Sequence, residues 1–154
     1  MIASKSPARH SLWTRIFAGA LTWAAAYNLI WVLAWFVFMR RQWLAALAES
    51  RHTLPWHEIW IVWIALTVPL GAAVMAYVAH PSRAGAPTRA ALAASLTLWI
   101  PLTTGTVGWG ISQSLSLGIV ALDAIVNLIA LGGASLAGAR TLQRFDRQWP
   151  SAHG

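Results

Sequence analysis

Four long apolar runs, separated by short polar or basic segments, dominate this sequence. A helix needs about 20 apolar residues to cross a hydrocarbon core roughly 30 Å thick, and each run reaches that length. Only 10% of the residues are charged, whereas an ordinary soluble domain has about 25%. The sequence therefore predicts an all-α integral membrane protein, with one domain (residues 1–154) forming a four-helix transmembrane bundle. The predicted spans are residues 16–39, 56–79, 89–111 and 115–138.

The first run is too long for the apolar part of a secretory signal peptide, which covers about 7 to 15 residues. We therefore expect it to remain as the first transmembrane helix. Arg40 and Arg41 are expected to end that helix. Residues 42–55 then form a connector, in which bulky apolar and charged residues alternate and favour a short interfacial helix.

Proline and glycine mark the remaining boundaries. Pro69 predicts a kink in the second span and Pro101 an interruption of the third, because proline lacks the backbone N–H of a helix. Residues 81–88 are rich in Pro, Gly and Ser and predict a tight loop. The turn at residues 112–116 is so short that the third and fourth spans must form an antiparallel hairpin.

Lysine and arginine are distributed unevenly around the runs. Eight of the eleven lie in the N-terminal tail (residues 1–15), the second loop with Arg89, and the C-terminal tail (residues 139–154). The first loop holds the other three and the third loop none. Because positively charged loops face the cytoplasm, both termini are predicted to be cytoplasmic.

The net charge of +7 would suggest nucleic-acid binding in a soluble chain. Here the basic residues lie at the ends of apolar runs, where they meet anionic lipid headgroups. The predicted partner is therefore the lipid bilayer, and not nucleic acid. The absence of cysteine excludes disulfides and thiolate metal sites. The chain is tryptophan-rich, and many of its eleven tryptophans lie near the predicted helix ends, as in aromatic belts.

Asp123 is the one charged residue well inside a predicted span. A charged carboxyl at mid-bilayer costs about 2.5–3.5 kcal/mol on insertion scales, so its presence requires an explanation. Asn127 lies four residues later and therefore on the same helix face. That face continues with the small residues Ala130, Ala134 and Gly138, while Leu122, Ile125, Ile129 and Leu136 are expected to face lipid.

The other predicted spans place polar and aromatic residues at a similar depth. We predict a pocket in the outer half of the bilayer with Asp123 and Asn127 at its base, binding a small amphiphile or a proton. The other predicted ligand-binding residues are Asn28 and Trp31 of the first span, Trp63 of the second and Thr103 of the third. On the second span, one helix face carries Trp56, Trp60, Trp63 and Thr67.

A structural role for Asp123 is the alternative. Its carboxyl would then accept hydrogen bonds from Asn28, Thr103 or Asn127 and hold helices together, at about 0.6 kcal/mol for each bond. No predicted span contains a basic residue at this depth, so Asp123 is not half of a buried ion pair.

Histidine gives little support for a cofactor. All five histidines lie at span ends or in tails, whereas haem held between helices needs histidine inside the spans. His52, His57 and Glu58 form a weak metal-binding pattern that is better interpreted as an interfacial cluster. No nucleophile motif or carboxylate pair is present. The sequence therefore predicts no enzymatic activity, no bound metal and no cofactor.

Two stretches carry a family resemblance: Tyr27 to Leu47 (YNLIWVLAWFVFMRRQWLAAL) and Leu115 to Leu136 (LSLGIVALDAIVNLIALGGASL). They resemble small bacterial four-helix inner-membrane families of unknown function. In those families an aromatic first helix ends in a basic segment, and the last helix begins with a Leu-rich turn and an Asp, matched here by Leu117 and Asp123. The resemblance implies the architecture and a bacterial inner membrane and draws attention to Asp123; it implies no activity.

Two functions remain open from the sequence. The protein is either a binding or transport module acting at Asp123, or a non-catalytic accessory subunit of a larger membrane complex. The bundle is small for a solitary transporter, so a homo-oligomer or a larger membrane assembly is expected in either case.

Overall fold

The computed structural model describes residues 8–50, 56–83, 85–112 and 115–148, and all regular structure within these ranges is helical. Four helices are long and apolar enough to cross a membrane, over Leu12–Ala46, Trp60–Val78, Pro87–Ser112 and Leu117–Phe145. The prediction of an all-α, four-helix, multi-pass membrane protein is confirmed. The elements are α1 (Ala8–Ala34), the π-helix η1 (Trp35–Met39), α2 (Arg40–Ser50), α3 (Trp56–Val78), the 3₁₀-helix η2 (Pro81–Arg83), α4 (Pro87–Ser112) and α5 (Leu117–Gln148).

The first helix does not stop at Arg40 and Arg41, as the sequence suggested. It continues from α1 through η1 into α2 and reaches Ser50. The Arg40 N–H bonds the Trp35 carbonyl, five residues back, so the backbone stays hydrogen-bonded. Long arginine side chains can extend from a helix toward water, and the Arg40 guanidinium lies 5.8 Å from the Phe36 ring centre. The rest of the predicted connector, residues 51–55, lies outside the described residues.

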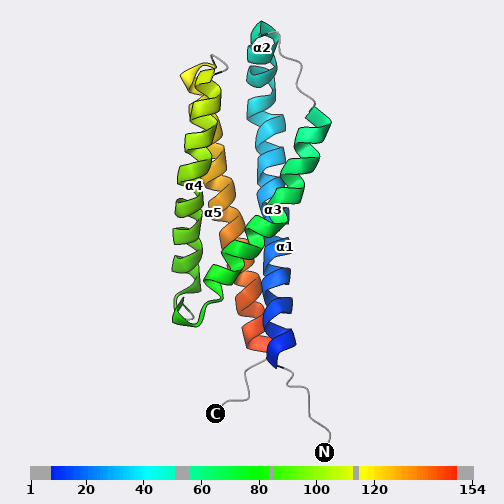
Figure 1. Ribbon diagram of the computed structural model, residues 1–154, viewed down its shortest axis with the longest axis vertical. Coiled ribbons are helices and arrows are strands. Elements are labelled where there is room, and N and C mark those ends of the chain that lie inside the picture. Colours follow the sequence, from blue (N-terminus) through cyan, green and yellow to red (C-terminus); the bar gives the residue numbers. More distant parts are fainter. Residues whose placement is uncertain (1–7, 51–55, 84, 113–114, 149–154) are drawn as a thin grey trace, which may run out of the picture.

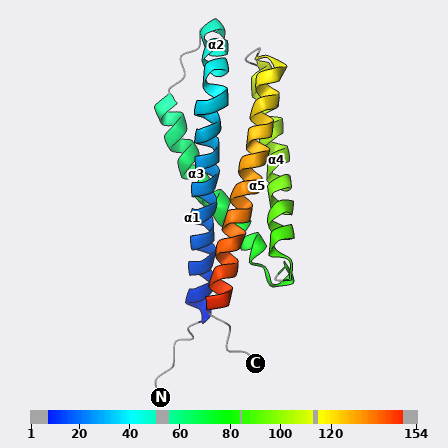
Figure 2. The same ribbon diagram turned by 180° about the vertical axis from the view of Figure 1, so that it is seen from behind.

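The bundle is built on the antiparallel pair of α1 and α5, which run side by side through its centre (Figures 1 and 2). Helix α4 packs on α5, and α3 packs on α1. Helix α3 is tilted: its C-terminal part approaches α4, while its N-terminal part lies on the other side of α1 from α4 in both views. We call the end where α1 begins and α5 ends the terminal end, and the opposite end, with α2 and the α4–α5 connection, the hairpin end.

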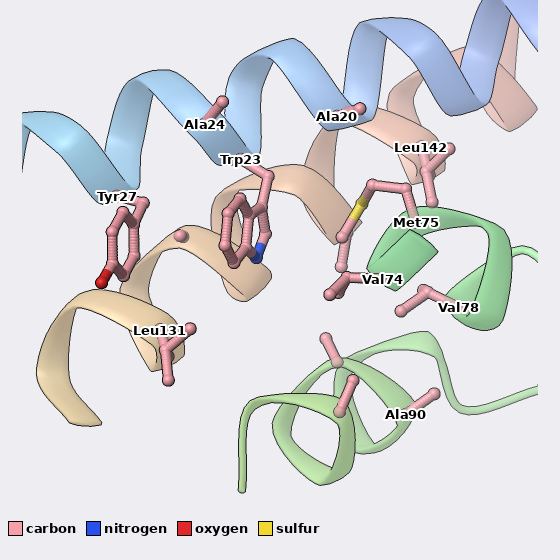
Figure 3. Close-up of a cluster of buried hydrophobic side chains, with 14 of the residues drawn as sticks. Ala20, Trp23, Ala24, Tyr27, Val74, Met75, Val78, Ala90, Leu131 and Leu142 are labelled. Carbon is pink, nitrogen blue, oxygen red and sulfur yellow. The ribbon is translucent and has the colours of Figure 1, made fainter. Parts of the chain in front are cut away.

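Small residues allow the two central helices to approach closely. Ala130 and Ala134 of α5 are fully buried. A Cβ placed on Gly138 would lie 3.1 Å from the Gly19 carbonyl of α1 and 2.6 Å from the Met75 sulfur of α3. The predicted small-residue face of α5 therefore faces protein. Figure 3 shows the core around this contact, with side chains of α1, α3, α4 and α5.

The opposite face of α5 is only partly as predicted. Ile125 and Ile129 are 55% and 59% exposed, consistent with contact to lipid. Leu122 instead packs against a second cluster of buried side chains nearer the hairpin end, and Leu136 is half-buried. That cluster comprises Trp35, Met39 and Trp43 with Ile119 and Val126. Several tryptophans are thus core residues and do not serve only as interfacial anchors.

The two prolines within spans leave their helices continuous. Pro69 lies within α3 and Pro101 within α4, and both are exposed. The predicted interruption of the third span at Pro101 is therefore wrong. Helix α4 begins at Pro87, the first-turn position that suits proline because its missing N–H would have no helical partner there. The α4–α5 turn is closed by a bond from the Leu115 N–H to the Gly110 carbonyl (2.9 Å).

Candidate functional site

Asp123 and Asn127 lie one turn apart on α5 and are both buried, with 4% and 5% of their surface exposed. The Asn127 amide donates to the Asp123 carboxylate Oδ2 (2.9 Å) and to its main-chain carbonyl (3.1 Å). These bonds confirm that the two side chains share a face. The site lies in the half of the bundle near the hairpin end, because Asp123 is six residues into α5.

Helix α1 supplies two donors to the same asparagine. The Tyr27 hydroxyl donates to Asn127 Oδ1 at 2.7 Å, and the Trp31 indole N–H donates to the same oxygen at 3.1 Å. An asparagine side chain has two N–H donors and two acceptor lone pairs, and here all four are used. Asn127 therefore joins α1 to α5, with its amide orientation determined by its partners.

Helix α4 reaches the acid through Thr106, whose side chain is hydrogen-bonded to the Asp123 carboxyl. The same hydroxyl lies 3.1 Å from the Leu102 carbonyl, and its single hydrogen bonds one of these two acceptors at a time. Thr103, the residue predicted for this role, is not hydrogen-bonded to the acid. Its hydroxyl is buried and has no partner within the described part of the chain.

The register of the hairpin explains why Thr106, and not Thr103, lies opposite Asp123. Thr106 lies six residues before the end of α4 at Ser112, and Asp123 lies six residues after the start of α5 at Leu117. Residues at equal distances from an antiparallel turn lie opposite each other, so counting from these helix ends would have identified Thr106. The predicted spans placed the end of the third helix one residue early and the start of the fourth two residues early.

Asn28 also lies apart from the acid. Its amide donates to the Thr67 hydroxyl of α3 at 2.9 Å and to the Ala24 carbonyl at 2.8 Å. It follows Tyr27 directly, and consecutive helical residues point about 100° apart, so Asn28 faces α3 while Tyr27 faces α5. The Asn28 side-chain oxygen is buried and has no partner among the described residues.

Aromatic rings surround the polar groups. Trp31 lies edge-to-face with Trp60 (5.6 Å between ring centres, 77° between planes) and stacks on Trp35 at 6.0 Å. Trp63, a predicted site residue, contacts the ring of Tyr27 at 6.1 Å and so supports the site indirectly. Trp60 was not among the predicted site residues, although the helical stripe on the second span contained it. The side chain of Trp56, from that stripe, lies outside the described residues.

The electrostatic setting of Asp123 follows from the sequence. In the stretches 16–39, 60–79 and 90–139 it is the single residue of an ionisable acidic or basic type other than tyrosine. Hydrogen bonds from Asn127 and Thr106 therefore offset the desolvation cost of burying the Asp123 carboxyl. Of the residues in the weak metal pattern, His52 lies outside the described residues, as do the side chains of His57 and Glu58.

Comparisons with protein-family models, with curated proteins and with solved structures find no match to this chain.

Proposed function

We propose that this protein binds a small amphiphilic molecule, or carries a proton, at Asp123 within the hydrocarbon region of a membrane. The observation that carries the proposal is a single buried acid, placed where groups from three helices meet, with no basic residue at its depth in any span. We further propose a bacterial inner membrane, with both termini in the cytoplasm and the hairpin end outside.

A purely structural role accounts poorly for the acid. Among the described residues, the side-chain bonds that join α1 to α5 run from Tyr27 and Trp31 to Asn127, from Trp23 to Ser135 and from Thr141 to Thr22. None of them involves Asp123. The acid bonds Asn127 on its own helix and Thr106 on α4. An interhelical hydrogen bond in a membrane contributes about 0.6 kcal/mol, which is small beside the few kcal/mol that a charged group costs there.

The test uses purified protein reconstituted in phosphatidylcholine vesicles. Binding is followed with N-phenyl-1-naphthylamine, a neutral fluorescent amphiphile, and proton movement with trapped pyranine under an imposed pH gradient. Wild-type protein should bind the probe or accelerate proton entry relative to empty vesicles. Asp123→Asn should remove that activity.

Ser135→Ala provides a matched control. Ser135 is a buried polar residue on the same helix, and its hydroxyl accepts a bond from the Trp23 indole at 2.9 Å. It lies three turns from Asp123, so its loss should leave activity at Asp123 intact. Wild-type vesicles that behave like empty ones in both assays, together with no binding of a cationic amphiphile, would contradict the proposal.

A second candidate, an accessory subunit of a larger complex, is favoured by the length of the first helix. From Ala8 to Ser50 it is continuous, about 64 Å at 1.5 Å per residue, whereas the hydrocarbon core is about 30 Å thick. The segment beyond the membrane offers a surface for a partner. Native mass spectrometry after extraction in mild detergent should then show a stoichiometric companion; a homogeneous monomer or homo-oligomer would count against this role.

A further inference from the structure

We propose that the ligand is a lipophilic organic cation: an ammonium group with N–H donors on an apolar, preferably aromatic, body. This inference rests on the proposed function, since it specifies the class of amphiphile that binds at Asp123. Three features of the site support it: an unused hydrogen-bond acceptor, the arrangement of ring faces, and the absence of a competing cation.

One unused acceptor lies near the acid along its helix. Thr103 Oγ1 is buried and lacks a partner in the part of the chain that the structure describes, and Thr103 is one turn from Thr106. Buried polar atoms in native proteins nearly always have a partner. A ligand carrying several N–H groups supplies donors to such atoms.

The rings of Trp31, Trp35 and Trp60 form a corner, which the bond from the Trp31 N–H to Asn127 ties to the site. Trp60 stands nearly perpendicular to both Trp31 and Trp35, at 77° and 81° between ring planes. Perpendicular rings present a face and an edge side by side, and the face of an aromatic ring attracts cations. Trp31, Trp60 and Trp63 are all only half-buried, so part of each ring remains uncovered in the isolated chain.

The charge of the site also favours a cationic ligand. Asp123 has no internal cationic partner at its depth, so a bound ammonium forms an ion pair without displacing one. An anion would be repelled by the same carboxylate, and a neutral molecule would leave it without a counter-charge. An ion pair of this kind is strengthened by the low dielectric of the surroundings.

The ligand is expected to enter from the bilayer. Trp31, Trp60, Thr103 and Thr106 are half-buried, whereas Asp123 is almost completely covered. A cation with an apolar body first partitions into the bilayer and then reaches the acid laterally.

The experiment compares three ligands of the same shape by calorimetric titration into protein in phosphatidylcholine nanodiscs. They are 1-naphthylmethylamine, its neutral analogue 1-naphthylmethanol, and the trimethylammonium analogue, which has charge but no N–H. The amine should bind at least about tenfold more tightly than the alcohol, equivalent to about 1.4 kcal/mol, with the trimethylammonium compound between them. Empty nanodiscs provide the correction for partitioning into lipid.

Two variants localise the effect. Asp123→Asn should reduce the preference for the amine over the alcohol to near unity, and Trp60→Leu should weaken the binding of both cations more than that of the alcohol. The wild-type comparison alone remains decisive if either variant fails to fold.

The outcomes separate this inference from the proposed function. Equal affinity for amine and alcohol would overturn the cation inference while supporting amphiphile binding. No binding of any of the three compounds, together with no proton entry and no binding of N-phenyl-1-naphthylamine in the vesicle assays, would overturn both.

Discussion

Asn127→Ala should destabilise the bundle clearly more than Asp123→Asn, although the two residues are bonded to each other. The Asn127 side chain accepts the two bonds from Tyr27 and Trp31 that join α1 to α5. At about 0.6 kcal/mol each in a membrane protein, their loss costs about 1.2 kcal/mol. The Tyr27 hydroxyl would also lose its acceptor in a residue that is 1% exposed, which adds about 1 kcal/mol or more.

Asp123→Asn should lower the free energy of unfolding far less than Asn127→Ala does. The new side chain keeps an oxygen that can accept from Asn127, and the one contact to another helix at risk is that to Thr106. The expected cost is at most about 0.6 kcal/mol.

Reversible unfolding in mixed dodecylmaltoside and dodecyl sulfate micelles, followed by circular dichroism, measures both costs. Tyr27→Phe completes a double-mutant cycle with Asn127→Ala. The cycle should return a coupling of about 1.6 kcal/mol, because it contains both the bond and the cost of the unpaired hydroxyl. If Asp123→Asn destabilised the bundle as much as Asn127→Ala, the acid would be a structural residue and the reasoning about the site would be refuted.

Three further predictions concern packing, the site and topology. Gly138→Val should lower the free energy of unfolding by about 1–3 kcal/mol in the same assay, because a side chain there meets α1 and α3. Gly132→Val should have little effect, since a Cβ at residue 132 has nothing within 4 Å. Equal costs for the two variants would refute the packing argument. Thr106→Val should weaken the binding of 1-naphthylmethylamine severalfold in nanodiscs. Thr104→Val should not, because the exposed Thr104 hydroxyl bonds a carbonyl of its own helix. Equal losses of affinity in the two variants would show that the bond to Asp123 is irrelevant to binding. A cysteine introduced at Ser116 into this cysteine-free chain should react with an impermeant maleimide from outside intact cells, and protection until lysis would reverse the proposed orientation.

Much of the architecture follows from the sequence because a membrane imposes strong constraints. The lengths of the apolar runs predict four spanning helices, since backbone polar groups in lipid must be satisfied within the helix. The spacing of Asp123 and Asn127 with the small residues after them correctly predicts which face of α5 meets protein. These are properties of single helices, and the spacing of residues in the sequence of one helix predicts which residues share a face.

The errors concern relations that depend on other helices or on helix ends. The pair Arg40-Arg41 suggested a helix end because charges leave the hydrocarbon core, but leaving the core does not require the helix to stop. Asn28 was placed with the acid on grounds of depth, whereas its rotation about α1 directs it to Thr67 of α3. Thr103 was preferred to Thr106 because a small error in the helix boundaries shifts the register across the hairpin.

The most direct test of the central claim, that Asp123 is a carboxyl that ligands reach from the bilayer, is its modification by dicyclohexylcarbodiimide, a hydrophobic carboxyl reagent. Peptide mass spectrometry of the reconstituted protein should find Asp123 modified. The trimethylammonium analogue, which has no N–H to attack the activated carboxyl, should protect Asp123, and 1-naphthylmethanol should not, while the modification of the other three acidic residues is unchanged. An Asp123 that never reacts, or that reacts equally with and without the trimethylammonium compound, would contradict the account.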